Sequence, residues 1–251
     1  MKGKPTRPFE EALWGRILIV SSVAYFTRLA ACGIHEFLGH GLWAWIMGAK
    51  NVEGYVSWLG FGWCRWSPGL SGFAGVIAMA GGLINTFIIG ATILAFLQIR
   101  SKKAGFYLRF TLFWLGYWAT ITQASYLILG GLTGYGDPGQ LSYLTGVPLG
   151  FFSFLGFALF LLVYYVSSVL FLSEVSCLFP EYKPKTLLFE FWLTLPIQVC
   201  VFAASPEHNL SFELFLTLSI ASVIPSLLAL PLFKLFRRTK TARKNGAGEG
   251  I

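Results

Sequence analysis

The sequence predicts an all-α polytopic membrane protein with about six transmembrane helices and a short interfacial β-hairpin-like segment after the first helix. Of its 251 residues, 55% are hydrophobic and 12% are charged, and the mean hydropathy is +0.66. A soluble domain carries about 25% charged residues. Apolar stretches long enough to cross the hydrocarbon, which takes about 20 helical residues, recur along the chain. The net charge of +8 lies mostly in the two tails and one short loop, a pattern typical of membrane orientation rather than of nucleic-acid binding.

The first part of the chain predicts a tail, a long helix and a hairpin. Residues 1–15 form a basic tail, which we expect in the cytosol. Residues from about 16 to 47 form one apolar segment, long enough to cross the membrane with a tilt or kink and interrupted by Arg28. Residues from about 48 to 72 combine glycine, aromatic side chains and partial alternation, which predicts a short strand or hairpin at the interface.

Five further apolar stretches predict the remaining transmembrane helices. They cover about 73–99, 106–129, 147–172, 187–204 and 210–236. The last contains Pro225 and Pro231, which predict kinks. We therefore expect one transmembrane domain over residues 16–236 and a disordered basic tail over residues 237–251.

The charges between these helices predict an orientation. The segment Arg100–Lys103 and both tails are basic, whereas the loops on the opposite side of the predicted membrane carry few lysines and arginines. Because positive loops stay on the cytoplasmic side, both termini are predicted to be cytosolic.

One apolar stretch contains two of the three histidines in the chain, His35 and His40, together with Glu36. Ionisable groups at membrane depth are costly, so they are functional candidates by default. A His-Glu pair followed by a second histidine on a helix can present a zinc site with an adjacent general base. The two histidines stand about 140° apart on a regular helix, because one residue more than the usual spacing separates them. A π-bulge near Gly39 would bring both to one side; in the alternative, Glu36 itself is a ligand beside His40.

The stretch His35–Leu42 resembles the metal-binding helix of the site-2 protease family of intramembrane zinc metalloproteases. Ala80–Asn85 is similar to that family's Ala-Gly-Pro-x-x-Asn helix start, with Gly82 in place of the proline. Gly134–Gly139 lies where the family has an Asp-Gly segment that supplies a metal ligand. The resemblance covers about residues 29–141, which it marks as the catalytic core.

The resemblance implies a zinc-dependent endopeptidase with named site residues. His35, His40 and Asp137 are implied to hold Zn²⁺, and Glu36 to act as the general base. The predicted topology supports Asp137 independently: the histidines lie in the outer half of the first helix, and Asp137 lies in the outer loop after the third helix. The site is therefore expected toward the non-cytosolic leaflet. In the alternative, Asp137 is a solvated residue of a Gly-Asp-Pro-Gly turn.

Asn85 is expected to donate to the substrate backbone or to the developing oxyanion, or else to link two helices by a hydrogen bond. The expected partners are the lipid bilayer and a transmembrane protein substrate that unwinds locally and pairs with the strand-like residues 52–63. No nucleic-acid partner is expected, and the sequence does not specify an oligomeric state. Two other functions fit the same residues. One is a non-catalytic protein that binds or regulates a membrane partner, and the other is a transporter with a His/Glu relay.

Overall fold

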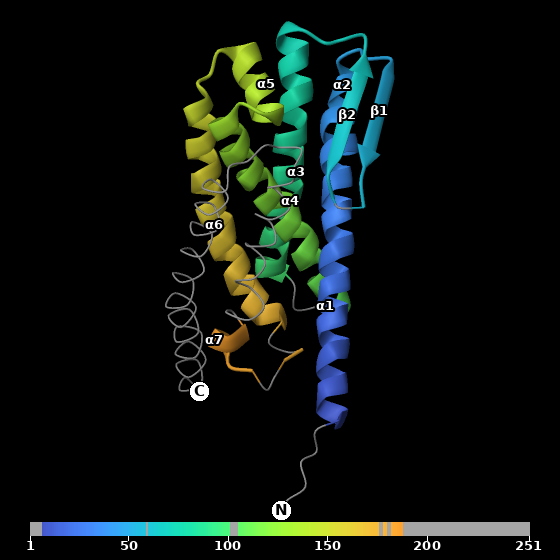
Figure 1. Cartoon of the computed structure of the whole chain (residues 1–251), viewed down its shortest axis with the longest axis vertical. Helices are drawn as coiled ribbons and strands as arrows, with labels where there is room; N and C mark the ends of the chain where they lie inside the picture. Colours follow the sequence, from blue (N-terminus) through green and yellow to red (C-terminus); the bar gives the residue numbers. More distant parts are fainter. Residues whose placement is uncertain (1–6, 59, 101–104, 176–177, 180–181, 188–251) are drawn as a thin grey trace, which may run out of the picture. The chain divides into compact units, whose positions relative to one another are not determined.

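The computed structural model describes residues 7–58, 60–100, 105–175, 178–179 and 182–187 (Figure 1). The chain divides into two compact units, Met1–Leu159 and Phe160–Ile251. All the predicted site residues belong to the first unit. Residues 1–6, the helices expected over about 187–204 (beyond Leu187) and 210–236, and the basic tail lie outside the described residues.

The first helical segment is continuous but changes its winding at the histidine motif. It consists of α1 (Arg7–Gly33), the π-helix η1 (Ile34–Gly41) and α2 (Leu42–Ile46). A π-helix closes its turns with i→i+5 hydrogen bonds, so residues five apart stand about one turn apart. The predicted π-distortion is therefore confirmed, and it extends over the whole motif.

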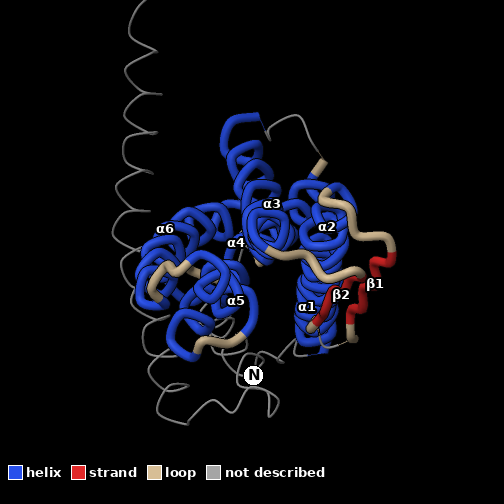
Figure 2. The backbone as a smooth tube through the Cα atoms, turned by 90° about the horizontal axis from the view of Figure 1, so that it is seen from above, coloured by secondary structure: helices blue, strands red, loops and turns tan. Residues whose placement is uncertain are grey.

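A β-hairpin follows, as predicted from the alternating residues. The strands β1 (Asn51–Val56) and β2 (Gly62–Ser67) are antiparallel, with a register that runs from Asn51 opposite Ser67 to Val56 opposite Gly62. The hairpin packs against η1 and lies on the outer side of the first helical segment (Figure 2). The Tyr25 hydroxyl of α1 donates to the Trp58 carbonyl at 2.7 Å, which ties the turn of the hairpin to the helix.

The remaining described elements are helices: α3 (Gly72–Arg100), α4 (Phe106–Thr133), α5 (Gly136–Thr145), α6 (Leu149–Val175) and α7 (Pro184–Leu187). Within the first unit, α3 packs against both η1 and α4, and α4 also packs on α1. The centre of this unit is aromatic, because α4 contributes the fully buried rings of Phe110, Phe113, Trp114 and Tyr117. A helix with so many large buried side chains is held in place by its neighbours, so residues on it have fixed positions.

Three helical segments of the described part are long and apolar enough to cross a membrane: residues 14–46, 72–99 and 149–175. Large apolar side chains also point outward from them, as shown by Phe26, Phe73 and Phe154, which are 66%, 77% and 75% exposed. Such exposure is typical of a surface that faces lipid. The chain is thus compatible with a membrane protein. The expected six spans are not confirmed: α4, although long, is not among these three, and the last two expected spans lie outside the described residues.

One expected loop is a helix. Residues 130–146 lie between two apolar stretches and are therefore expected to form an outer loop, yet α5 occupies Gly136–Thr145. Aspartate and proline are also residues of a helix's first turn, where a missing N–H costs nothing and a carboxylate is favoured. Both residue types therefore suit a helix start as well as a turn.

Candidate metal centre

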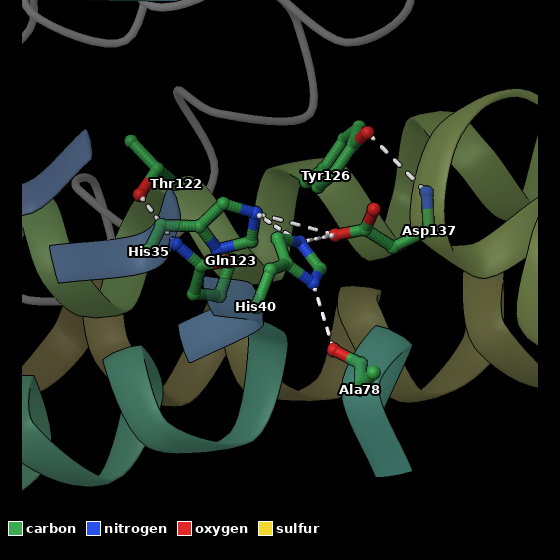
Figure 3. A network of polar contacts seen from close by, with 7 residues as sticks. All are labelled: His35, His40, Ala78, Thr122, Gln123, Tyr126 and Asp137. Carbon is green, nitrogen blue, oxygen red and sulfur yellow. Dashed lines mark hydrogen bonds and ion pairs between the residues drawn. The ribbon is translucent and has the colours of Figure 1, made fainter. Parts of the chain in front are cut away.

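The two histidines of the π-helix and Asp137 meet at one point, although 97 residues separate Asp137 from His40 (Figure 3). The Nε2 atoms of the imidazoles are 3.2 Å apart. Asp137 Oδ2 is 3.0 Å from the His40 Nε2 atom and 3.2 Å from the His35 Nε2 atom. All three residues are buried. Two nitrogen atoms and one carboxylate oxygen thus form a compact triangle inside the protein.

The dimensions of this triangle fit a tetrahedral zinc ion. Zinc binds histidine nitrogen and carboxylate oxygen at about 2.0–2.2 Å, so neighbouring ligand atoms of a tetrahedral site lie about 3.3–3.6 Å apart. The three observed separations, 3.0–3.2 Å, are close to this value. The donor set is also the one that zinc prefers in catalytic sites: three protein ligands of nitrogen and oxygen, with a fourth position for water. The residues present therefore fit the ion that the sequence implies.

The His40 ring is held in the orientation that a metal ligand needs. Its Nδ1 atom is 2.9 Å from the carbonyl oxygen of Ala78 in α3. A carbonyl only accepts, so Nδ1 carries a proton. Nε2, on the side of Asp137, is then the atom that can bind a metal once it has lost its own proton. Hydrogen bonds of this kind fix the orientation of metal-binding histidines.

The backbones of η1 and α3 approach closely next to the site, and glycines at the contact make this approach possible. A Cβ atom at Gly39 would lie 2.5 Å from the Gly82 Cα, and a Cβ atom at Gly82 would lie 2.3 Å from His40 Nε2. No side chain of any kind fits at either position without a shift. Gly39 and Gly82 thus let the two helices touch next to the His40 imidazole.

Glu36 lies beside the triangle. Single ligand atoms of His35, Glu36 and His40 all lie within 4.8 Å of one another, and Glu36 is buried. The Glu36 carboxylate faces the start of β2, where a Cβ atom at Gly62 would be 2.8 Å from Glu36 Oε1. The shorter separations to Asp137 favour the aspartate over Glu36 as third ligand. Glu36 then lies next to the position that a metal would take, so it can serve either as a base or as a further ligand.

Asp137 is a buried residue of α5 and not a solvated turn residue. Its backbone N–H donates to the Tyr126 hydroxyl of α4 at 3.3 Å. Burial raises the pKa of the Asp137 carboxyl, but the charge of His40 and the hydrogen bonds from His35 and His40 outweigh it, so the pKa lies below its usual range. The carboxylate is therefore ionised, which is the form that binds a cation.

Asn85 does not take part in the contacts that join the two histidines and Asp137. Its Nδ2 atom donates to the Leu38 carbonyl of the π-helix at 3.1 Å. This bond links α3 to η1, as in the helix-linking alternative for this residue, and its role toward a substrate stays a prediction.

Sequence reasoning did not assign three features of the centre: the Ala78 carbonyl, the Tyr126 hydroxyl and the contact of Gly62 with Glu36. A carbonyl and a glycine carry no signal of their own in a sequence. Tyr126 does carry a sequence signal, because it follows the polar pair Thr122 and Gln123 in an apolar helix. Polar groups in such a helix tend to face the interior of the protein.

Comparison with protein-family models, curated proteins and solved structures finds no match to this chain.

Proposed function

We propose that this chain is an intramembrane zinc endopeptidase of the site-2 protease type, which hydrolyses peptide bonds of membrane-embedded or membrane-proximal substrates. The observation that carries the proposal is the triangle of His35 Nε2, His40 Nε2 and Asp137 Oδ2, with sides of 3.0–3.2 Å. Glu36, buried beside it, adds a candidate base.

In this proposal the protein holds the metal and moves the proton. A zinc ion, when bound, acts as a Lewis acid and lowers the pKa of a coordinated water to about 7. Glu36 accepts a proton from the attacking water and returns it to the leaving amine. His40, fixed by the Ala78 carbonyl, keeps its lone pair on the metal side.

The hairpin supports a binding mode for the substrate. A helical substrate hides its carbonyls in hydrogen bonds, so it must become extended before hydrolysis. Gly62 of β2 lies against Glu36, and an added strand on this hairpin brings a peptide bond near the base. Asn85 remains a candidate donor for the substrate or for the oxyanion.

The proposed membrane orientation follows from charge. With the basic segments in the cytosol, both termini are cytosolic and the metal centre lies toward the non-cytosolic leaflet. The three candidate spans are consistent with a multi-pass protein.

The test combines metal analysis with hydrolysis. The full chain is purified in detergent, and zinc content is measured for the wild type and for His35→Ala, His40→Ala, Asp137→Ala and Glu36→Gln. We expect one zinc per chain in the wild type and in Glu36→Gln, and a loss of zinc in the three ligand variants. A wild type without stoichiometric zinc would overturn the proposal.

Hydrolysis is followed on casein, an unfolded probe that needs no unwinding. We expect cleavage by the wild type and a loss of about 100- to 10,000-fold in Glu36→Gln, because the base is removed while the metal stays. Glu53→Gln is the matched control, since Glu53 is exposed on β1. Full activity of Glu36→Gln would remove Glu36 as the base. Zinc binding without any hydrolysis would favour the non-catalytic alternative.

A further inference from the structure

Two buried polar atoms, His35 Nδ1 and Gln123 Oε1, have no hydrogen-bond partner among the described residues. A buried donor or acceptor that is left unpaired destabilises the fold, so such atoms usually have a partner. His40 has an acceptor for its Nδ1 atom in the Ala78 carbonyl, whereas His35 has none. The two histidines are thus equivalent toward Asp137 but not on the side away from it.

The missing partner of His35 is defined by its chemistry. When Nε2 of a neutral imidazole binds a metal, Nδ1 carries the proton and becomes a donor. The side chain that pairs with it must therefore accept. Gln123 Oε1 is an acceptor, and it lacks a donor.

Gln123 is placed to supply that acceptor. It lies on α4 one helical turn before Tyr126, whose ring centroid is 6.1 Å from that of His35, and residues three apart share a helix face. Gln123 is buried, at 4% exposure. Figure 3 draws Gln123 in the same close-up as His35 and Tyr126.

The orientation of the Gln123 amide is already set by its neighbour. The Thr122 hydroxyl donates to the Trp118 carbonyl of its own helix. Its oxygen then accepts from Gln123 Nε2 at 3.2 Å. Because the amide nitrogen is engaged by Thr122, the amide oxygen is the end left to accept.

We propose that Gln123 is a positioning residue for the metal centre: its Oε1 atom accepts a hydrogen bond from His35 Nδ1 when His35 Nε2 binds the metal. This inference rests on the proposed function, because it assigns a partner to one of the proposed ligands. A series of hydrogen bonds then connects the Trp118 carbonyl, through Thr122 and Gln123, to His35. It fixes the His35 tautomer as Ala78 fixes that of His40.

The test measures zinc affinity and stability in the detergent-solubilised full chain. Affinity is measured by competition with a chromophoric chelator, and the Tm is measured without zinc. Gln123→Met keeps the length of the side chain but loses the acceptor, and we expect zinc to bind about 10- to 100-fold more weakly. Gln123→Glu keeps an acceptor, so its affinity is expected to equal or exceed that of the wild type.

Two threonine variants complete the design. Thr122→Val releases the Gln123 amide, and we expect it to weaken zinc binding severalfold. Thr120→Val is the matched control: Thr120 is also buried on α4, but its hydroxyl bonds only to carbonyls of its own helix. We expect its zinc affinity to equal that of the wild type.

The outcomes separate this inference from the function on which it rests. Equal zinc affinity of wild type and Gln123→Met overturns the role of Gln123 and leaves the metal centre intact. A lower affinity of Gln123→Glu than of Gln123→Met also overturns it. A drop in the zinc-free Tm with unchanged affinity assigns Gln123 to packing alone, which contradicts the inference. If Gln123→Met does not fold, the zinc affinities of Thr122→Val and Gln123→Glu test the role of Gln123 instead. A wild type without zinc overturns the proposed function itself.

Discussion

Gly82 of α3 lies so close to the imidazole of His40 that a Cβ atom at residue 82 would be 2.3 Å from Nε2. The site-2 protease pattern that this stretch resembles has proline there, which carries a Cβ atom. The same pattern has one residue fewer between its histidines. We infer that the two departures belong together: the longer spacing winds the motif as a π-helix, and the absence of a side chain at Gly82 accommodates the resulting position of His40.

Gly82→Ala should therefore damage the metal centre directly. The added methyl group must displace the His40 ring or separate the helices, at a cost of about 1–3 kcal/mol. We expect zinc affinity to fall by about tenfold or more, as measured by chelator competition. Gly150→Ala in α6 is the control, because a Cβ atom there meets nothing within 4 Å. Unchanged zinc binding in Gly82→Ala would contradict the contact.

Gly62→Ala should impair hydrolysis while the metal stays bound. A Cβ atom at Gly62 would lie 2.6 Å from Glu36 Cγ and 2.8 Å from the Tyr55 carbonyl oxygen, so the base or the strand must move. None of these nearest atoms belongs to His35, His40 or Asp137. Because a displacement of about 1 Å at a reacting group can cost 100-fold in rate, we expect a loss of up to about that size in casein cleavage with zinc content unchanged. Gly69→Ala, where a Cβ atom also meets nothing within 4 Å, should behave as the wild type. Loss of zinc in Gly62→Ala would show that β2 supports the ligands rather than the base.

Tyr126→Phe should loosen the attachment of Asp137. The substitution leaves the Asp137 backbone N–H without its acceptor, the Tyr126 hydroxyl. An unpaired buried donor costs about 1–3 kcal/mol, so we expect a lower Tm and weaker zinc binding. Tyr143→Phe removes a hydroxyl from an 86% exposed residue of α5 and should change neither quantity. If Tyr126→Phe matched the wild type in both, this hydrogen bond would have no role in holding Asp137.

Zinc itself should stabilise the fold. A ligand that binds only the folded state adds about 2.7 kcal/mol at a free concentration 100 times its Kd. We expect a higher Tm with zinc than after treatment with a chelator, and little or no increase in Asp137→Asn, which lacks the carboxylate. Magnesium should have no effect, because it prefers an octahedral set of oxygen ligands. Equal stabilisation of wild type and Asp137→Asn would place the zinc elsewhere.

Much of the site could be predicted because its signal is local. His35, Glu36 and His40 lie within six consecutive residues of an apolar segment. Ionisable side chains are costly there, so their presence indicates a function. Their five-residue spacing conflicts with a regular helix, and that conflict predicted the π-winding that η1 shows. The hairpin was also predictable, since alternation with glycine and aromatic residues is a local pattern.

The partners of the motif could not be predicted in the same way, because they depend on which helices touch. Asp137, Tyr126 and Ala78 belong to α5, α4 and α3, which are separate in sequence. Asp137 was placed by topology and resemblance, but its burial and its helix were not foreseen. Its residue types serve a turn and a helix start alike, so only packing distinguishes the two.

The sequence by itself determined that this chain has long apolar helices, a hairpin after the first of them, and a cluster of ionisable groups inside the first helical segment. These properties follow from composition and from spacing along a single stretch. Only the tertiary structure decided that Asp137 closes the triangle with the two histidines and that Glu36 stays outside it. It also decided that His35, within the described part of the chain, lacks the acceptor that His40 has. The physical reason is that separations of about 3 Å between residues far apart in the chain are set by the packing of α3, α4 and α5 against the π-helix.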